Sequence, residues 1–312
     1  MPHMFPSHRL IASALAIAAL FIAQIARGQA VSPPKPTLAD VAYGKHERQV
    51  LDFYKADSDK PTALLFFIHE GGWLGGDKGT PTFLVPCLKS GISVVSINYR
   101  LIRDAAAGGV NPPVKACLED SARALQFVRS KASQWNIDKS RICGCGISSG
   151  GFNALWLAFH RDLANPKSAD PVARESTRLS CALTLGAQTS LDPLQMKQWT
   201  PNNDYGYHAF ALTTYQEFLD KREKLMPWIL DYSPYAVLTA DAPPVYLSYD
   251  SAPALGQPCK DPVHSGNLGA GLAEKLRKLG VEHELNYPGA IGLRHPDMFG
   301  FLIDKLKGAP AK

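Results

Sequence analysis

The chain has 312 residues, of which 46% are hydrophobic, 20% charged and 9% aromatic. These values are those of an average globular domain, and they exclude a disordered chain, a collagen-like repeat and a coiled coil. Basic residues exceed acidic ones by 33 − 28 = 5 without forming a basic block, so no nucleic-acid partner is expected. The length admits two domains or one large α/β domain.

The first 30 residues have the pattern of a secretory signal. Arg9 precedes an apolar run of 14 residues, Leu10 to Ala23, and small residues, Gly28 and Ala30, stand where a signal peptidase reads the chain. A membrane span needs about 20 residues, so this run is short for an anchor. We therefore expect residues 1–30 to be removed and the mature chain to be secreted or periplasmic, with no membrane association.

Predicted strands and helices alternate along the rest of the chain. Continuous apolar runs such as Ala63 to Ile68 are typical of strands buried on both faces. Apolar residues spaced three and four apart indicate a long helix over residues 114–135. The strands are expected at 50–54, 63–68, 92–97, 141–146, 179–185, 245–249 and 281–287, and the other helices at 151–160, 267–279 and 296–306. This order predicts one α/β domain over residues 31–312, with a mostly parallel sheet covered on both faces.

Residues 187–240 interrupt this alternation. They hold nine of the 29 aromatic residues and carry helical signals around 212–229. Two interpretations remain open: an ordinary connection whose aromatic residues pack into the core, or a cap that walls a substrate pocket. The candidate substrate-binding residues are Trp73, Trp199, Tyr205 and His208.

Six cysteines allow 15 full disulfide pairings in an exported protein, and the sequence does not choose among them. Cys143 and Cys145 lie two apart in a predicted strand, so they share a face and are not expected to bond each other. Burial as free thiols is an equal alternative. Because the chain has neither a Cys-x-x-Cys pair nor a His-Glu-x-x-His motif, no metal site is expected.

The segment Gly146-Ile147-Ser148-Ser149-Gly150 has the Gly-x-Ser-x-Gly pattern between a predicted strand and a predicted helix. A sharp turn there strains the serine and exposes its hydroxyl, and small flanking residues avoid clashes with neighbouring segments. We expect Ser148 to be a nucleophile. Ser149 is the nearest rival and is expected to contribute its backbone N–H. The alternative is a glycine-rich turn that merely begins a helix.

The segment His69-Glu70-Gly71-Gly72 directly follows a predicted strand. It resembles the His-Gly-Gly-Gly loop of esterases and lipases with the α/β-hydrolase fold. The resemblance implies that the amides of Gly71 and Gly72, with that of Ser149, form an oxyanion hole, a large electrostatic contribution to acyl transfer. Glu70 departs from the usual glycine. His69 is expected to stabilise the loop and not to act as a base.

The acid and the base are expected after the last two strands, where this family carries them. Asp261, in a turn that leads into a helix, fits the family's acid, while Asp250 at the strand end remains an alternative. His295, between the last strand and the last helix, fits the base. His283 lies inside a predicted strand, which indicates a surface or packing role, whereas His264 adjoins the acid and could line the site.

The order Ser148, Asp261, His295 matches the family's order of nucleophile, acid and base. The chain most resembles hormone-sensitive-lipase-like carboxylesterases and bacterial xylan deacetylase or feruloyl esterase-like enzymes. This resemblance implies an exported serine esterase without a cofactor, acting on acetyl or feruloyl esters of plant polysaccharides. A peptidase, amidase or formamidase on the same fold, or a non-catalytic binding module, remains an alternative.

Overall fold

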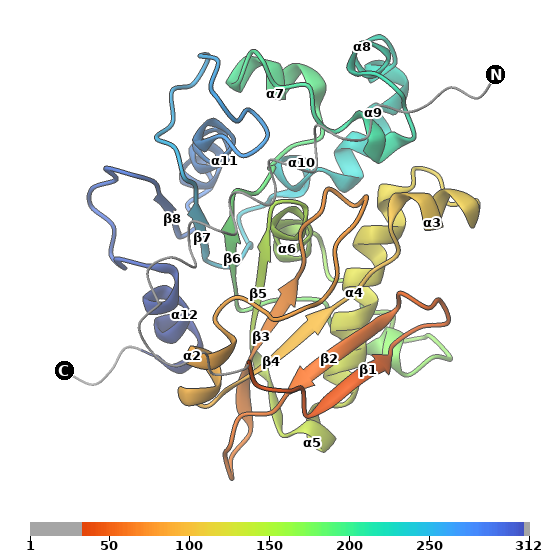
Figure 1. The fold of residues 1–312 in the computed structure, drawn as a ribbon, viewed down its shortest axis with the longest axis vertical. Coiled ribbons are helices and arrows are strands. Elements are labelled where there is room, and N and C mark those ends of the chain that lie inside the picture. Colours follow the sequence, from red (N-terminus) through yellow and green to blue (C-terminus); the bar gives the residue numbers. More distant parts are fainter. Residues whose placement is uncertain (1–32, 309–312) are drawn as a thin grey trace. The chain divides into compact units, whose positions relative to one another are not determined.

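The computed structural model describes residues 33–308, and the predicted signal peptide at residues 1–30 lies outside these described residues. Within them, the strands form one eight-stranded sheet in the order β1-β2-β4-β3-β5-β6-β7-β8 (Figure 1). β2 runs antiparallel to both β1 and β4, and every other neighbouring pair is parallel. The strands are β1 (Leu38–Ala42), β2 (Val50–Tyr54), β3 (Thr62–Ile68), β4 (Ile92–Ile97), β5 (Ile137–Ile147), β6 (Cys181–Leu185), β7 (Val245–Ser248) and β8 (His283–Asn286).

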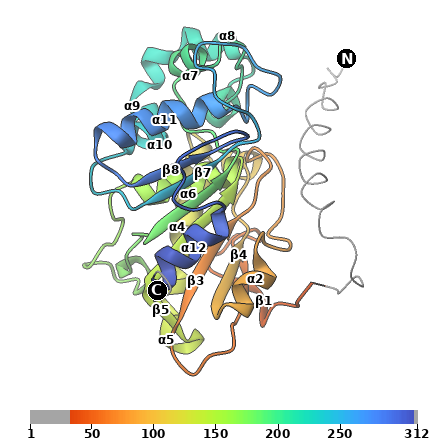
Figure 2. The ribbon, with the colours of Figure 1, turned by 90° about the vertical axis from the view of Figure 1, so that its left-hand side faces the viewer.

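Helices cover both faces of this sheet (Figure 2). They belong, with the sheet, to one compact unit that begins at Lys35. No helix within residues 33–308 is both long enough and apolar enough to cross a bilayer. The helices are α2 (Leu84–Lys89), α3 (Ile102–Ala107), α4 (Val114–Ser130), α5 (Ala132–Trp135), α6 (Ser149–Phe159), α7 (Pro193–Trp199), α8 (Tyr215–Asp220), α9 (Arg222–Tyr232), α10 (Pro234–Val237), α11 (Gly266–Lys278) and α12 (Met298–Lys307), with 3₁₀ turns η1 (Val172–Arg174) and η2 (Tyr207–Phe210).

The apolar run of strand β3 is continuous because both faces of this strand are buried. Leu64, Phe66 and Ile68 point into the cluster shared with α4, α6 and α11, while Leu65 and Phe67 point into the cluster shared with α2 and α12. Both sets are buried, because successive residues of a strand face opposite sides of the sheet and helices cover both sides. The prediction of a mostly parallel sheet covered on both faces is confirmed.

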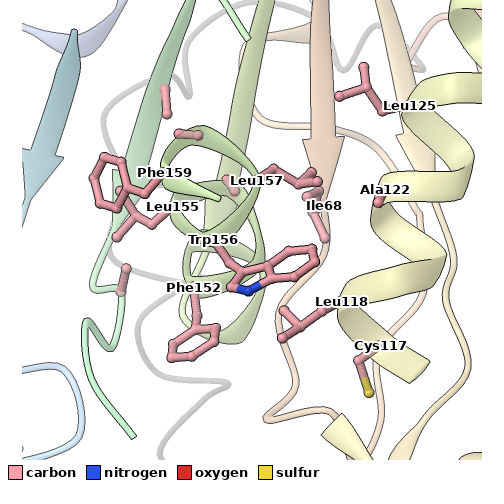
Figure 3. Close-up of a cluster of buried hydrophobic side chains, with 14 of the residues drawn as sticks. Ile68, Cys117, Leu118, Ala122, Leu125, Phe152, Leu155, Trp156, Leu157 and Phe159 are labelled. Carbon is pink, nitrogen blue, oxygen red and sulfur yellow. The ribbon is translucent and has the colours of Figure 1, made fainter. Parts of the chain in front are cut away.

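Helix α6 is buried along its whole length. Figure 3 shows its apolar side chains pointing to several sides of the helix, with Trp156 directed toward Ile68 of β3 and Leu118 of α4. A helix that is apolar on all sides belongs in the interior of a domain. The first turn of α6 is therefore held rigidly at the end of β5.

The predicted helix over residues 114–135 is two helices in the structure. Helix α4 ends at Ser130, and the one-turn helix α5 follows Lys131. Asn136, with φ of 57°, then turns the chain out of α5 and into β5. The left-handed conformation suits asparagine, and it explains why the apolar periodicity stops there.

Residues 187–240 form an insertion between β6 and β7 that contains α7, η2, α8, α9 and α10. Figures 1 and 2 both show α7, α8 and α9 at the end of the molecule toward which the central strands run. Many of its aromatic residues pack within it: Phe210 lies 5.2 Å from Phe218 between ring centroids, and Trp199 lies 5.2 Å from Tyr235.

Within residues 33–308, all six cysteines are free thiols. Cys143 and Cys145 lie on the same face of β5, as their spacing predicts, in the cluster that also holds Cys87 and Cys181. Burial raises the pKa of the Cys87 thiol to about 12, so this thiol stays protonated at neutral pH.

Candidate active site

Ser148 occupies a strained turn between β5 and α6. Its φ of 50° and ψ of −121° place it outside the regions that residues with a side chain normally adopt. A Cβ on Gly146 would lie 2.3 Å from backbone atoms of Gly150, and a Cβ on Gly150 would lie 2.1 Å from the carbonyl oxygen of Ile68. Steric crowding therefore requires glycine on both sides of the serine, as the Gly-x-Ser-x-Gly pattern predicts.

A histidine and an aspartate continue from this serine in a chain of hydrogen bonds. Ser148 Oγ lies 2.9 Å from His264 Nε2, and His264 Nδ1 lies 2.9 Å from Asp261 Oδ2. The backbone N–H of His264 also donates to Asp261 Oδ1 at 3.3 Å. The carboxylate therefore orients the imidazole, and the imidazole reaches the hydroxyl. This is the geometry of an activated nucleophile.

Asp261 and His264 stand on one turn between β7 and α11, three residues apart. The side chain of His264 is 23% exposed and that of Asp261 is 45% exposed. Burial by itself raises the pKa of the Asp261 carboxyl, but hydrogen bonds from His264 and its backbone N–H outweigh it, so this pKa lies below its ordinary value. The carboxylate is therefore ionised at neutral pH, as an orienting acid must be.

The structure does not bring His295 to Ser148, which corrects the prediction that His295 is the base. Its Nδ1 lies 2.5 Å from Glu284 Oε1, and its Nε2 lies 3.4 Å from Asp304 Oδ2. The ring packs edge-on against Phe301, on the face of the sheet that α12 covers. Carboxylates on β8 and α12 thus bind both ring nitrogens and turn the side chain toward α12.

The other acid and base candidates lie apart from this chain of hydrogen bonds. Asp250 is exposed just after β7, and its side chain makes no hydrogen bond or ion pair within residues 33–308. His283 Nδ1 bonds the carbonyl oxygen of Val281 at 2.8 Å, which is a local packing role. The sequence signal for His264 was its spacing from Asp261, because three residues along one turn bring a carboxylate within reach of an imidazole.

The segment that follows β6 contacts both the serine turn and the turn that carries His264, and the sequence analysis did not identify it. Gln188 is fully buried, and its Nε2 donates to the carbonyl oxygen of Val263 at 2.9 Å and faces Ser148 Oγ at 3.5 Å. Its Oε1 is buried and finds no partner in the described part of the chain. Gly186 lies beside His264, and its φ of 56° is a left-handed conformation that favours glycine. The segment therefore ties the serine turn to the turn that carries the histidine.

The loop of residues 69–73, called here the oxyanion loop after the role expected from the sequence, follows β3. His69 is buried and stacks on Tyr99 at 4.4 Å, and its Nδ1 lies 2.6 Å from the carbonyl oxygen of Glu70. Arg48 Nη2 lies 3.3 Å from the other ring nitrogen. Because burial lowers the pKa of His69 to about 4, the ring is neutral and donates from Nδ1. His69 thus stabilises the loop and lies apart from Ser148, as the sequence suggests.

The amide of Gly72 differs from its predicted role. It donates to the side-chain Oγ of Ser149 at 2.9 Å, so in the structure this amide is directed at a hydroxyl of α6. The amide of Gly71 has no hydrogen-bond partner within residues 33–308, and Gly71 has φ of 115°. The residue after the nucleophile therefore contributes its side chain to holding the loop, which the motif alone did not indicate.

Of the four candidate substrate-binding residues, two are buried away from solvent. Trp73 is fully buried, and its Nε1 donates to Asn153 Oδ1 at 2.9 Å. Trp199 packs against Tyr235. Tyr205 and His208 approach the oxyanion loop: His208 Nε2 lies 3.1 Å from the Gly72 carbonyl oxygen. Both side chains are partly buried.

In the described part of the chain, no three His, Cys, Asp or Glu side chains gather closely enough to hold a metal ion. The polar groups around Ser148 are those of nucleophilic chemistry: a hydroxyl, an imidazole and a carboxylate in sequence, and backbone amides nearby.

Comparison with known proteins identifies the family of this chain. The model of the BD-FAE family matches residues 51–253, well over half of the sequence. The chain belongs to the BD-FAE family. Among curated proteins, it is 27% identical over 231 residues to the carboxylesterase NlhH of Mycobacterium tuberculosis, an alignment that covers 72% of this chain and 63% of that protein. The chain thus spans less than two thirds of that relative's length.

Solved structures with a similar fold identify the fold of this BD-FAE family member. An acetyl ester-xyloside bifunctional hydrolase from Caldicellulosiruptor lactoaceticus superposes with a TM-score of 0.61 at 22% identity, covering 88% of this chain and 92% of that one. The thermophilic esterase Est2 of Thermogutta terrifontis superposes with a TM-score of 0.59 at 23% identity, covering 83% and 84%. The predicted α/β-hydrolase fold is confirmed.

Proposed function

We propose that this BD-FAE family member is a serine hydrolase that cleaves carboxylic esters with Ser148 as nucleophile, His264 as base and Asp261 as the orienting acid. One observation carries the proposal: two hydrogen bonds of 2.9 Å join Ser148 to His264 and His264 to Asp261 in a single line. The strained serine backbone and the match to a carboxylesterase support it.

In the first step, His264 Nε2 takes the hydroxyl proton as Ser148 Oγ attacks the ester carbonyl carbon. The carbonyl π bond breaks, and its electron pair moves to the oxygen. When the tetrahedral intermediate collapses, the alcohol leaves with the proton from His264, and an acyl-enzyme remains. Water attacks the acyl-enzyme in the same way, the acid departs, and Ser148 regains its proton.

We propose that the negative oxygen of the intermediate is held by the amides of Gly71 and Ser149. The amide of Gly71 is free within residues 33–308, and that of Ser149 stands at the first turn of α6, where the helix favours negative charge. The Gly72 amide donates to Ser149 Oγ. Its contribution is therefore to hold the loop in place.

We propose acetyl or feruloyl esters of plant polysaccharides as the substrate class. Support comes from what similar proteins are: a carboxylesterase, and a bifunctional hydrolase for an acetyl ester and a xyloside. We also propose export to the periplasm or the medium, on the basis of the signal pattern in residues 1–30.

The test is hydrolysis of p-nitrophenyl acetate by the wild-type chain and by Ser148→Ala. Ser180→Ala is a matched control, because Ser180 precedes β6 at the end of the strand away from Ser148 and bonds Ser140. We expect wild type and the control to hydrolyse the ester at equal rates, and Ser148→Ala to be inactive. A fluorophosphonate should label wild type and Ser180→Ala and should leave Ser148→Ala unlabelled. Equal rates in wild type and Ser148→Ala would overturn the proposal.

The substrate class is tested separately, on acetylated xylan and methyl ferulate with the wild-type chain. Release of acetate or ferulate, absent with Ser148→Ala, is the expected result. Hydrolysis of p-nitrophenyl acetate without activity on either of these substrates would leave the esterase proposal standing and overturn the substrate class.

A further inference from the structure

Gly72 is enclosed by contacts from two different parts of the chain. Its N–H donates to Ser149 Oγ of α6 at 2.9 Å. Its carbonyl oxygen lies 3.1 Å from His208 Nε2, which belongs to η2 of the insertion. The hydroxyl of Tyr205 would lie 3.2 Å from a Cβ at this position. The insertion thus reaches the oxyanion loop directly, and it does so at a residue whose φ of 62° favours glycine.

The bond from His208 has one possible direction. A carbonyl oxygen only accepts, so His208 Nε2 must carry the proton and donate it to Gly72. Burial lowers the pKa of His208 to about 4, which keeps the ring neutral at the pH where esterases are assayed. The ring is also packed on its sides, at 4.7 Å from Tyr205 and 5.8 Å from Trp73 between centroids. His208 is therefore a fixed donor.

Holding the Gly72 carbonyl fixes more than one atom. A peptide group is planar, so the bond from His208 also sets the direction of the Trp73 N–H in the same peptide. The preceding peptide is set by the Gly72 N–H on Ser149 and by the Gly71 carbonyl, which accepts from Leu74 at 3.0 Å. Both peptides that flank Gly72 are thereby oriented, and the Gly71 amide comes immediately before them.

We propose that His208 is a positioning residue, which holds the oxyanion loop from the insertion so that the Gly71 amide faces the oxygen that becomes negative. This role rests on the proposed esterase function. It gives the insertion a specific role, which is to fix the orientation of the hydrogen-bond donors of the site. The sequence had indicated His208 as a residue that binds substrate.

The test compares substitutions at His208 that differ in one property each. His208→Gln keeps an N–H donor, while His208→Met has a similar length and no donor. His208→Phe keeps the aromatic packing against Trp73 without the donor. The matched control is His160→Phe: His160 is buried, packs on Trp156 at 4.5 Å and bonds a backbone carbonyl, but lies at the far end of α6.

Three measurements are made on each purified chain: kcat and KM for p-nitrophenyl acetate, thermal midpoint, and the inhibition constant of an alkyl trifluoromethyl ketone. This ketone adds to the serine oxygen and forms a tetrahedral oxyanion, so its affinity reports on the oxyanion hole. A misplaced donor costs about 10- to 100-fold in rate. We expect kcat to fall and the inhibition constant to rise by that factor in His208→Met and His208→Phe, with KM within twofold.

His208→Gln is expected to stay within about threefold of wild type, and His160→Phe to lose thermal stability while keeping its kcat. If His208→Phe does not fold, the comparison of Gln with Met decides the outcome. The role is overturned if Met and Gln have equal kcat and equal inhibition constants, or if the loss appears in KM alone. A wild-type chain with neither hydrolysis nor phosphonate labelling would overturn the esterase function first, and the positioning role with it.

Discussion

Two histidines compete for the role of base, and separate substitutions of each should decide between them. In His264→Ala, Ser148 loses the nitrogen that lies 2.9 Å from its hydroxyl. General base catalysis contributes about 10²- to 10⁴-fold, so we expect kcat on p-nitrophenyl acetate to fall about 10³-fold. That factor corresponds to about 4 kcal/mol in the activation free energy. KM and the thermal midpoint should change little.

His295→Ala should instead lower the thermal midpoint and leave kcat nearly unchanged. It removes the imidazole beside two nearly buried carboxylates, Glu284 and Asp304, whose side chains are 10% and 13% exposed. Asp304 keeps its ion pair with Lys305 at 3.1 Å, so Glu284 loses the most. Leaving the buried Glu284 carboxylate without its side-chain partner costs about 3 kcal/mol, so the thermal midpoint should fall by roughly 6 to 12 °C. At 25 °C the folded protein should keep a kcat within about threefold of wild type, since His295 does not contact Ser148.

The assay for both variants is steady-state hydrolysis below the thermal midpoint, with active sites counted by phosphonate titration so that unfolded protein does not enter the rate. Circular dichroism gives the midpoints. The reasoning is refuted if folded His295→Ala loses about 10³-fold in kcat while His264→Ala remains active. That result would mean that the position of a histidine after the last strand predicts the base better than its contacts do.

Three further predictions concern the same site. Asp261→Asn should lower kcat by about 10²-fold, while Asp250→Asn stays within twofold, as measured on the same ester; the opposite order would identify Asp250 as the acid. Gln188→Met removes the hydrogen bond to the histidine turn, so kcat should fall about 10-fold. It also removes a buried oxygen without a partner, so the thermal midpoint should stay equal or rise. A lower midpoint with unchanged kcat would contradict this. His69 and His208 have pKa values lowered by burial to about 4, whereas the unfolded chain binds their protons near the ordinary value of 6.5. The unfolding free energy therefore falls as pH decreases from about 6.5 to about 4, and urea titrations at pH 7 and pH 5 should show a loss that is about 2 kcal/mol smaller in His208→Gln than in wild type. Equal losses in the two proteins would contradict this account of the buried ring.

Strands that are buried on both faces were the easiest elements to predict. Ile92 to Ile97 was predicted with its observed bounds, because helices on both sides of the sheet make every position apolar. Edge strand β1 is mostly exposed and carries no such signal. Helices α2 and α3 have six residues each, which is too short for an apolar periodicity to appear.

The serine turn was predictable because its requirements are local: two glycines and a strand-to-helix junction within five residues. The geometry around His295 was not, because the direction of that side chain depends on Glu284 and Asp304, which become its neighbours only when β8 and α12 pack together. In the same way, the contact of His208 with Gly72 joins residues 136 apart in sequence, and no spacing rule relates them.

The turn that carries Asp261 and His264 places the proposed acid and base within four residues of chain, so the two side chains move as one unit. The two side chains form their bond as soon as the turn forms, and any displacement of the segment between β7 and α11 moves them together. Such a displacement leaves the bond of 2.9 Å between them intact and changes the distances from His264 to Ser148 and from Val263 to Gln188. The chain beyond α11 carries none of the three residues proposed to react. Under that proposal, substitutions in β8 and α12 change the stability of the sheet edge and leave the proposed chemistry unchanged.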